Sequence, residues 1–447
     1  MNKATVQRRA IVVVGGLVCL LSLLSYRLVH IQFIKHGEFA AMGRPSKTKG
    51  VPVVAPRGAI VDRHGEVLAF SKPIRRIEID KYQYPRAVPM CAILAKAQGG
   101  GDPEAMAAHL DKSQRVDYFE QLIAERLAPA TFRPKEDMEP GSQEEAEALD
   151  EWRQSLYEFI SDPRKKHVPL RQLVDATAIE SVEAEMSKWG GVKFITQYKR
   201  IYPAGKTACH VMGYVSGSKG KEGAEGALDY FLAGQDGLGS SDGRQLLREP
   251  VPGRHVRLTI DLALQGVVED VLDQAYVDTG ASKVVAILTD PYNGEILALA
   301  NRPHFDPNDL NQGEAVDRFN VAVCGAYEPG STFKVIAHGA AIDQGLVSLR
   351  THYHCHWGFL EDLALTDLGK YGNISVQEIL AVSSNIGTYK IAKELDPGDY
   401  FNYILNMGFQ EKTGVRLTAE KPGRVPHPDR WHDNTLSRLA MGYGVQA

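Results

Sequence analysis

A serine and a lysine three residues apart, Ser331 and Lys334, have the types and spacing needed for nucleophilic chemistry. They open a run of helix-forming residues that reaches Ile342, and residues three apart share one face of a helix. A buried lysine favours its neutral amine, which can accept the proton of a nearby serine hydroxyl. The first helical turn also stabilises a developing oxyanion through its backbone N–H groups. By itself, however, this pattern is common, and a capping serine followed by a surface lysine is its ordinary explanation.

A second polar pair, Ser383 and Asn385, follows downstream. Ser375 and Glu378 predict a capping box that opens a short apolar helix, and Ser383 and Asn385 fall between that helix and the next. A loop of this kind could place a hydroxyl and an amide beside the nucleophile. A polar corner between two helices is the alternative, and the presence of a Ser-x-x-Lys pattern in the same domain favours catalysis.

The elements that must position these residues predict an α+β domain. At 447 residues the chain is long enough for two or more domains, and its composition changes near residues 250–253. Beyond that point, residues 284–288 and 295–300 predict two strands joined by a turn at 290–294. Helices follow, which indicates a sheet flanked by helices.

Before that boundary the signals are weaker. Residues 51–69 predict two short β pieces around a turn at 62–65. Residues 99–168 are polar and helix-prone, with an acidic run that indicates solvated helices rather than an acidic binding site.

Only the N-terminal region departs sharply from a soluble composition. Residues 10–34 are long and apolar enough for a transmembrane anchor, with Arg27 close enough to one end to reach the interface. Basic residues precede it, so residues 1–9 should stay in the cytoplasm and the rest should lie on the outer side of the inner membrane. A cleaved signal peptide is the alternative, but no small-residue cleavage pattern follows the apolar run directly.

Composition excludes some functions. The net charge of −4 provides no basis for nucleic-acid binding. The five cysteines are scattered and odd in number, which is no disulfide framework but leaves room for one bridge, and their redox state is open. A histidine-rich stretch could suggest zinc, but its spacing is tight for one ion, so we expect no metal there. The residues in that stretch are His352, His354, Cys355 and His356.

The sequence resembles the class B penicillin-binding proteins, monofunctional D,D-transpeptidases related to the serine β-lactamases. Several ordered motifs over most of the chain carry the likeness: residues 57–63 (Arg-Gly-Ala-Ile-Val-Asp-Arg), 200–203, 210–214, 259–262, 290–299 and 327–334. One position departs from the family pattern, since Ala224 stands where a larger apolar residue is usual.

The resemblance implies a pedestal of the dimerisation type over residues 35–250 and an incomplete transpeptidase domain over 251–447. By the same likeness Ser331 is the nucleophile, Lys334 its base, Ser383 a proton carrier, and Asn385 a partner of Lys334 and of the substrate amide. The implied substrates are peptidoglycan stem peptides, with β-lactams as covalent inhibitors and no cofactor. A glycosyltransferase and other division proteins are the implied partners.

The family's third motif, a Lys-Thr/Ser-Gly strand, has one apparent match at residues 412–414. This match follows a predicted helix too closely, and in the family its position belongs to a structural segment. We therefore expect the catalytic motif to lie beyond Ala447, and the 447-residue chain to acylate poorly or not at all.

Three features favour the division-specific (septal) type over the elongation type: Asn385 itself, residues 442–444 (Gly-Tyr-Gly), and residues 407–409 together with 413–414. A β-lactamase or β-lactam sensor, and a non-catalytic division scaffold, are the alternatives. Rapid nitrocefin turnover would indicate the lactamase, and the reading frame beyond Ala447 would test the scaffold.

Overall fold

The computed structural model describes residues 21–22, 25–26, 50–135, 137–240 and 246–447. The contacts divide the chain into a small unit, residues 1–53 with 236–250, and a large unit, residues 54–235 with 251–447. The predicted anchor, residues 10–34, lies almost wholly outside the described ranges. Within those ranges, none of the helices combines the length and the apolar character that a bilayer crossing requires.

The small unit contains a three-stranded antiparallel sheet. Its strands are β1 (Val51–Val53), β8 (Gly237–Gly239) and β9 (Leu246–Arg248), with β8 in the middle.

In the large unit, the first half is built on one long strand. The strands are β2 (Ile60–Val61), β3 (Val67–Asp80), β4 (His167–Asp175), β5 (Val192–Ile201) and β10 (Val256–Arg257). β2 pairs antiparallel with β3, which confirms the turn predicted at residues 62–65. β3 is longer than predicted because its alternating apolar residues continue and it pairs with both β4 and β5.

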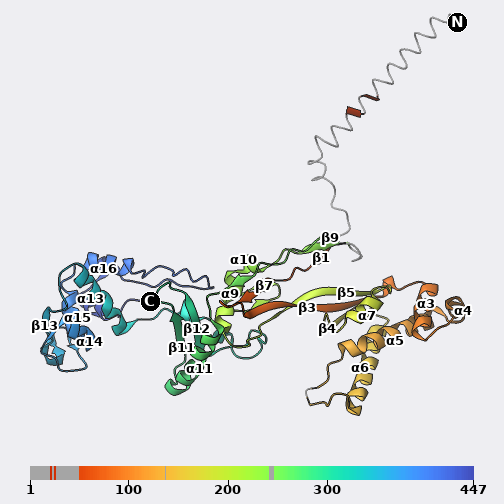
Figure 1. Cartoon of the computed structure of the whole chain (residues 1–447), viewed down its shortest axis with the longest axis horizontal. Coiled ribbons are helices and arrows are strands. Elements are labelled where there is room, and N and C mark those ends of the chain that lie inside the picture. Colours follow the sequence, from red (N-terminus) through yellow and green to blue (C-terminus); the bar gives the residue numbers. More distant parts are fainter. Residues whose placement is uncertain (1–20, 23–24, 27–49, 136, 241–245) are drawn as a thin grey trace, which may run out of the picture. The chain divides into compact units, whose positions relative to one another are not determined.

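Helices share a hydrophobic core with this sheet and lie along it and past one of its ends (Figure 1). They are α3 (Ala87–Ala97), α4 (Pro103–His109), α5 (Lys112–Thr131), α6 (Gln143–Ser161) and α7 (Glu180–Met186). The acidic helix α6 is largely solvated, as predicted, and buries only Leu156 and Ile160. α5 differs, because Phe119, Ile123 and Leu127 on one face lie fully buried in the core.

A second core joins segments on both sides of residue 250. Residues of α8 (Cys209–Met212), α9 (Gly223–Ala227) and α10 (Asp229–Leu232) contribute to it, and the short strands β6 (Val215–Ser216) and β7 (Lys219–Gly220) lie between α8 and α9 in the chain. Ile260 and Leu299 pack in the same cluster as Ile60 and Ala224. Ala224 is fully buried there, so a small side chain is accommodated where the family pattern has a larger one.

The second half of the large unit begins with α11 (Leu262–Thr279) beside the hairpin of β11 (Val284–Thr289) and β12 (Ile296–Arg302), as Figure 1 shows. The antiparallel pairing of β11 and β12 confirms the predicted hairpin. Helices follow, in agreement with the predicted α+β class. These are α12 (Val321–Cys324), α13 (Lys334–Asp343), α14 (Val376–Ala381), α15 (Asn385–Ala392), α16 (Pro397–Asn406) and α17 (Thr435–Ala440).

Between α13 and α14 lie two small antiparallel pairs. β13 (His352–His354) pairs with β16 (Asn373–Ser375), and β14 (Phe359–Leu360) pairs with β15 (Leu365–Thr366). The predicted capping box opens α14, since Ser375 and Glu378 satisfy each other's backbone N–H groups.

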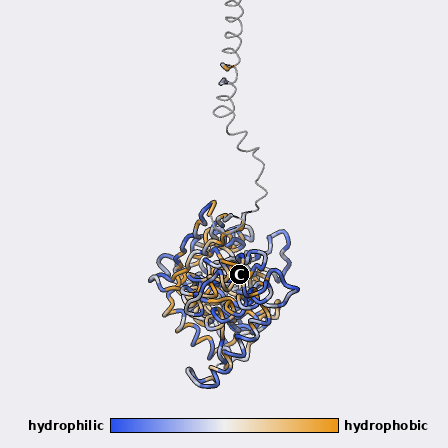
Figure 2. The backbone as a smooth tube through the Cα atoms, turned by 90° about the vertical axis from the view of Figure 1, so that its right-hand side faces the viewer, coloured by the Kyte–Doolittle hydropathy of each residue, from blue (hydrophilic) through white to orange (hydrophobic). Residues whose placement is uncertain are grey.

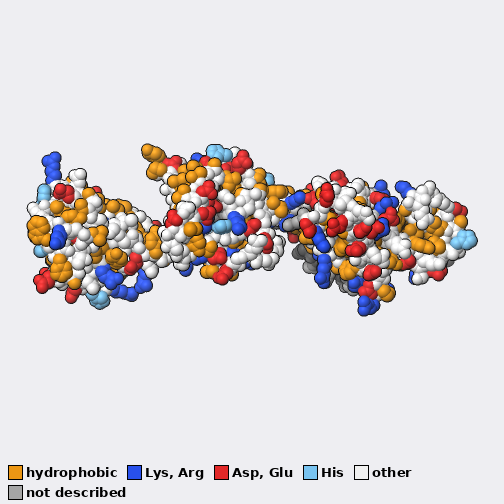
Figure 3. All heavy atoms as spheres, turned by 90° about the horizontal axis from the view of Figure 1, so that it is seen from below, with side chains coloured by type: hydrophobic (Ala, Val, Ile, Leu, Met, Phe, Trp, Pro, Cys, Tyr) orange, Lys and Arg blue, Asp and Glu red, His pale blue; other side chains and the backbone are white. Residues whose placement is uncertain are grey.

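The surface is mixed in character. Hydrophobic and hydrophilic stretches alternate along the backbone (Figure 2), as expected where each element buries one face. Acidic and basic side chains are interspersed over the face seen in Figure 3, in keeping with the small net charge. The four cysteines in the described part of the chain are free.

Candidate active site

Ser331 lies on a 3-10 turn, η4 (Gly330–Phe333), that leads directly into α13. Its side chain is exposed, and its hydroxyl has no hydrogen-bond partner among the described residues. The helix-forming residues that reach Ile342 are apolar nearly all round, which predicts a helix buried on every side, but Val335 is 54% exposed and Ile342 is 37% exposed. α13 packs on one side only, and that side carries Phe333 and Lys334.

The turn before Ser331 is held against the chain's last helical segment. Gly330, with φ of +62°, donates its N–H to the carbonyl of Gly442 at 3.1 Å. Gly442 has φ of +80°, and a Cβ there would lie 2.1 Å from the Gly330 carbonyl oxygen. Glycine is therefore required at position 442 both by its backbone conformation and by this close approach.

Gly442→Ala should displace the Ser331 turn, because the new methyl group cannot fit against the Gly330 backbone. We expect a loss of roughly 1–3 kcal/mol of stability, measured as a lower melting temperature. Gly444→Ala is the matched control, since it shares the positive φ of +78° but a Cβ there meets no atom within 4 Å. Equal losses in the two variants would show that the close approach has no effect.

Lys334 is buried at 1% exposure, and its amine contacts the predicted Ser383–Asn385 loop. Nζ donates to the Ser383 carbonyl at 2.6 Å, to the Ser383 hydroxyl at 3.0 Å and to Asn385 Oδ1 at 2.7 Å. Burial lowers the pKa of Lys334 to about 8, although the charge of Asp367 acts in the opposite direction. The structure thus brings three of the four predicted site residues together and gives the lysine an accessible neutral form.

The loop itself is an abrupt junction between α14 and α15. Ser383 adopts a left-handed conformation with φ of +55°, which directs both its carbonyl and its hydroxyl to Lys334. Ser384 caps α15 by accepting the Gly387 N–H at 2.9 Å. The Asn385 amide is oriented from both ends, since Nδ2 donates to the Thr366 carbonyl at 2.7 Å while Oδ1 accepts from Lys334.

Asp367 is a site residue that sequence reasoning missed. Its carboxylate accepts from the Ser384 hydroxyl at 2.6 Å and from the backbone N–H groups of Asn385 and Ile386. The carboxylate therefore offsets the partial positive charge of the free N–H groups in the first turn of α15, and it holds the Ser383–Asn385 loop in place. An isolated aspartate after a short strand carries no local signal of this role, because its partners come from a different helix.

Asp367→Asn should loosen the loop, because one carboxylate oxygen becomes an amide NH₂ group, which cannot accept the hydrogen bonds that this oxygen accepts. We expect a destabilisation of about 1.5–3 kcal/mol, seen as a lower melting temperature. The pKa of Lys334 should also fall further, since the variant removes the charge that raises it. Asp362→Asn, at an exposed position in the same region, should leave both quantities unchanged.

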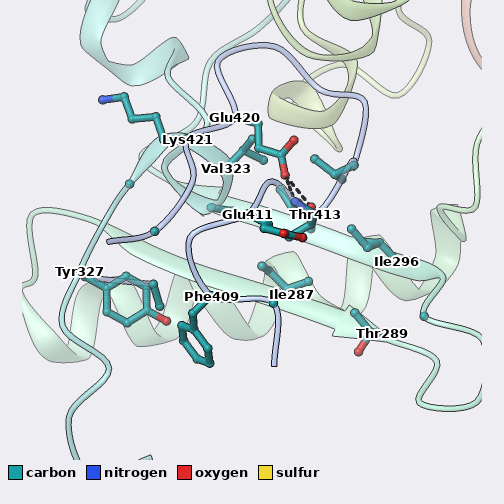
Figure 4. A pocket seen from close by; sticks show the side chains of 18 of the residues that line it. Ile287, Thr289, Ile296, Val323, Tyr327, Phe409, Glu411, Thr413, Glu420 and Lys421 are labelled. Atoms are coloured by element: carbon teal, nitrogen blue, oxygen red, sulfur yellow. Dashed lines mark hydrogen bonds between the residues drawn. The ribbon is translucent and has the colours of Figure 1, made fainter. Parts of the chain in front are cut away.

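Residues 412–414, the apparent third motif, lie in a loop and not in a strand. Glu420 Oε1 accepts the Thr413 N–H and hydroxyl, both at 2.6 Å, and the Gly414 N–H at 3.2 Å (Figure 4). This carboxylate occupies the donors that an oxyanion site would need. That residues 412–414 are structural and not catalytic stays a prediction, and these hydrogen bonds favour it.

The same loop lines a cavity of about 500 Å³ against the β11–β12 hairpin (Figure 4). Ile287, Ile296 and Phe409 contribute apolar walls, and Glu420 and Lys421 lie at one side. Ser331, Lys334, Ser383 and Asn385 do not line it, so it is separate from the candidate active site.

The histidine-rich stretch, residues 352–356, is hydrogen-bonded to α15. Lys390 Nζ lies 2.8 Å from His356 Nε2 and donates to the His354 carbonyl at 2.9 Å. Across the described residues, no three His, Cys, Asp or Glu side chains are grouped as a metal site would require.

Comparison with known proteins gives two family matches. Residues 52–246 match the penicillin-binding protein dimerisation domain, and residues 284–447 match the penicillin-binding protein transpeptidase domain. Together these matches cover most of the chain.

Among curated proteins, the chain is 27% identical over 433 residues to the "Probable peptidoglycan D,D-transpeptidase PbpC" of Pseudomonas aeruginosa, covering 94% of this chain and 67% of that protein. It is 29% identical to penicillin-binding protein PbpB of Mycobacterium tuberculosis, covering 88% of this chain and 55% of the relative. It is 26% identical to peptidoglycan D,D-transpeptidase FtsI of Escherichia coli, covering 64% of this chain and 50% of the relative. The chain thus spans roughly half to two thirds of the length of these relatives.

Solved structures show the same fold. Penicillin-binding protein 2X of Streptococcus thermophilus superposes with a TM-score of 0.67 at 21% identity, covering 89% of this chain and 57% of that one. A peptidoglycan synthetase from Bifidobacterium adolescentis superposes with a TM-score of 0.63 at 23% identity, covering 90% and 71%. With both domain matches in chain order, and with Ser383 and Asn385 hydrogen-bonded to the buried amine of Lys334, this chain belongs to the class B penicillin-binding proteins.

Proposed function

We propose that the protein is a peptidoglycan D,D-transpeptidase and that Ser331 is its nucleophile. The observation that carries the proposal is the buried amine of Lys334, one turn from Ser331 and hydrogen-bonded to Ser383 and Asn385. This arrangement supplies a base with a lowered pKa three residues after a serine whose side chain is exposed. The relatives named as peptidoglycan D,D-transpeptidases support the same reaction.

In the first half-reaction, the Ser331 Oγ attacks the carbonyl carbon of the penultimate D-alanine of a stem peptide. The hydroxyl proton passes to the neutral amine of Lys334, and the tetrahedral oxyanion then collapses. The bond to the terminal D-alanine breaks, and Ser383 relays a proton from Lys334 to the leaving amine. Asn385 holds Lys334 and binds the substrate amide.

In the second half-reaction, an amine of a stem peptide on a neighbouring peptidoglycan strand attacks the ester carbonyl of the acyl-enzyme. The new amide bond forms, the ester bond to Ser331 breaks, and the amine's proton returns to the serine oxygen through the same groups. A β-lactam would acylate Ser331 but release no leaving group, so it would remain as a stable adduct.

The septal role is the finer part of the proposal. The relatives named FtsI, the Asn385 motif and the Gly442–Gly444 motif support it. We further propose a single-pass anchor within residues 10–34, a cytoplasmic N-terminus, and a glycosyltransferase and other division proteins as partners. A fluorescent fusion that spreads along the side wall, and does not gather at the division site, would contradict the septal role.

Labelling with a fluorescent penicillin tests the nucleophile. The assay uses the full-length protein, as its gene encodes it, in membranes. Ser331→Ala should abolish the label, since no ester can form. Ser348→Ala removes another exposed hydroxyl of the same domain and should label like the wild type. Undiminished labelling of Ser331→Ala, or a wild-type protein that never labels, would reject the proposed function.

A further inference from the structure

His338 is a buried titratable residue that the proposed reaction does not use. It lies on α13 one turn after Lys334, on the same buried face, and is 2% exposed. Its Nε2 lies 3.1 Å from the Thr388 hydroxyl on α15, whereas its Nδ1 is buried with no hydrogen-bond partner in the described part of the chain. A polar ring left half-satisfied on a helix whose buried neighbours Ala337, Ala340 and Ala341 belong to an apolar core calls for an explanation.

The contacts of Thr388 define the protonation of the ring. The Thr388 hydroxyl donates to the Ser384 carbonyl at 2.7 Å, so its hydrogen is committed. It can therefore only accept from His338, which requires the neutral tautomer with the hydrogen on Nε2. Burial, together with the nearby Lys334 ammonium, lowers the pKa of His338 to about 4, so the ring stays neutral in the range where the enzyme would work.

These bonds complete a closed loop of contacts. Lys334 binds Ser383 and Asn385 directly, and one turn deeper His338 binds Thr388, which binds the carbonyl of Ser384 between them. The base and the Ser383–Asn385 loop are thus joined at two levels. With Lys334 alone, α13 could rock against α15, whereas two connections along one helix face fix its register.

We propose that His338 is a positioning residue of the acyl-transfer site: through Thr388 and Ser384, its Nε2–H holds the Ser383–Asn385 loop against Lys334. This inference rests on the proposed function, because its purpose is the geometry around the base. It adds to that function a residue outside the Ser-x-x-Lys and Ser-x-Asn motifs.

Three variants isolate the hydrogen bond. His338→Leu replaces the imidazole with an apolar side chain of comparable size and so removes the hydrogen-bond donor. His338→Gln restores an N–H donor at the far end of the side chain. Thr388→Val removes the hydroxyl from the other side. We expect the rate of acylation by a fluorescent penicillin to fall roughly 10- to 100-fold in His338→Leu and Thr388→Val, with the double variant no slower than either. His338→Gln should recover most of the rate.

The protonation state of His338 can also be measured directly, without following the reaction. Nitrogen-15 NMR of the imidazole in the 447-residue chain near pH 7 should show a protonated Nε2 and a bare Nδ1, with a signal that moves in Thr388→Val. An imidazolium, or a hydrogen on Nδ1, would overturn the proposal whatever the rates are.

The acylation outcomes separate the two hypotheses. If the wild type labels and Ser331→Ala does not, yet His338→Leu labels at the wild-type rate, the positioning role is wrong and the proposed function stands. If His338→Gln is as slow as His338→Leu, the ring acts through its shape and not through its donor, and the proposal also fails. If the wild type itself never labels, the proposed function fails, and the role of His338 in that reaction falls with it.

Discussion

Replacing Lys334 with methionine should lower the rate of β-lactam acylation by about 10²- to 10⁴-fold, the usual contribution of a general base. The wild-type rate should rise with pH through about 8, because the neutral amine is the active form and burial lowers the pKa of Lys334 to about 8. At pH 7 roughly one such amine in ten is neutral, against about one in 3,000 for a lysine with an ordinary pKa. Stopped-flow measurement of acylation across this pH range provides the test.

Lys412→Met is the matched control for this prediction. Lys412 belongs to the apparent third motif, but it is exposed on a loop whose donors are bound by Glu420. Its replacement should leave both the rate and the pH profile unchanged. A large loss in Lys412→Met, or a wild-type rate that is flat across pH 8, would contradict the assignment of Lys334 as the base.

Replacing Glu225 with glutamine should destabilise the large unit by about 3–5 kcal/mol, the cost of removing one partner from a buried ion pair. Glu225 is fully buried and accepts from Arg57 Nε and Arg200 Nε, both at 2.6 Å. Arg57 also contacts Asp229, and Arg200 donates to the Gly58 carbonyl at 2.8 Å. The neutral amide would leave two largely buried guanidinium groups without their shared counter-charge.

The measurement is the melting temperature of the variant against the wild type. Glu151→Gln is the control, because Glu151 is an exposed carboxylate on α6, and its loss should change stability by less than about 0.5 kcal/mol. Equal melting temperatures for Glu225→Gln and the wild type would show that the pair is replaceable by a neutral hydrogen-bond network.

The features that could be predicted from the sequence depend on residues that are close together along the chain. The β11–β12 hairpin followed from a strong turn between two apolar runs, and the α14 capping box followed from a serine and a glutamate three residues apart. The predicted meeting of Ser331, Lys334, Ser383 and Asn385 came from a family likeness, since no spacing rule connects residues in different helices. The structure brings Lys334, Ser383 and Asn385 into contact.

Only the tertiary structure revealed what surrounds those residues. Asp367 and His338 carry no signal in a single sequence, because each acts through partners that approach it only after α15 has packed. The burial that lowers the pKa of Lys334 is likewise a property of the packed helices and not of the four-residue motif. The sequence by itself therefore determined which side chains are available for the chemistry and which family the chain resembles. Packing decided which of them share a hydrogen-bond network, because desolvation and hydrogen-bond geometry depend on groups that are distant along the chain.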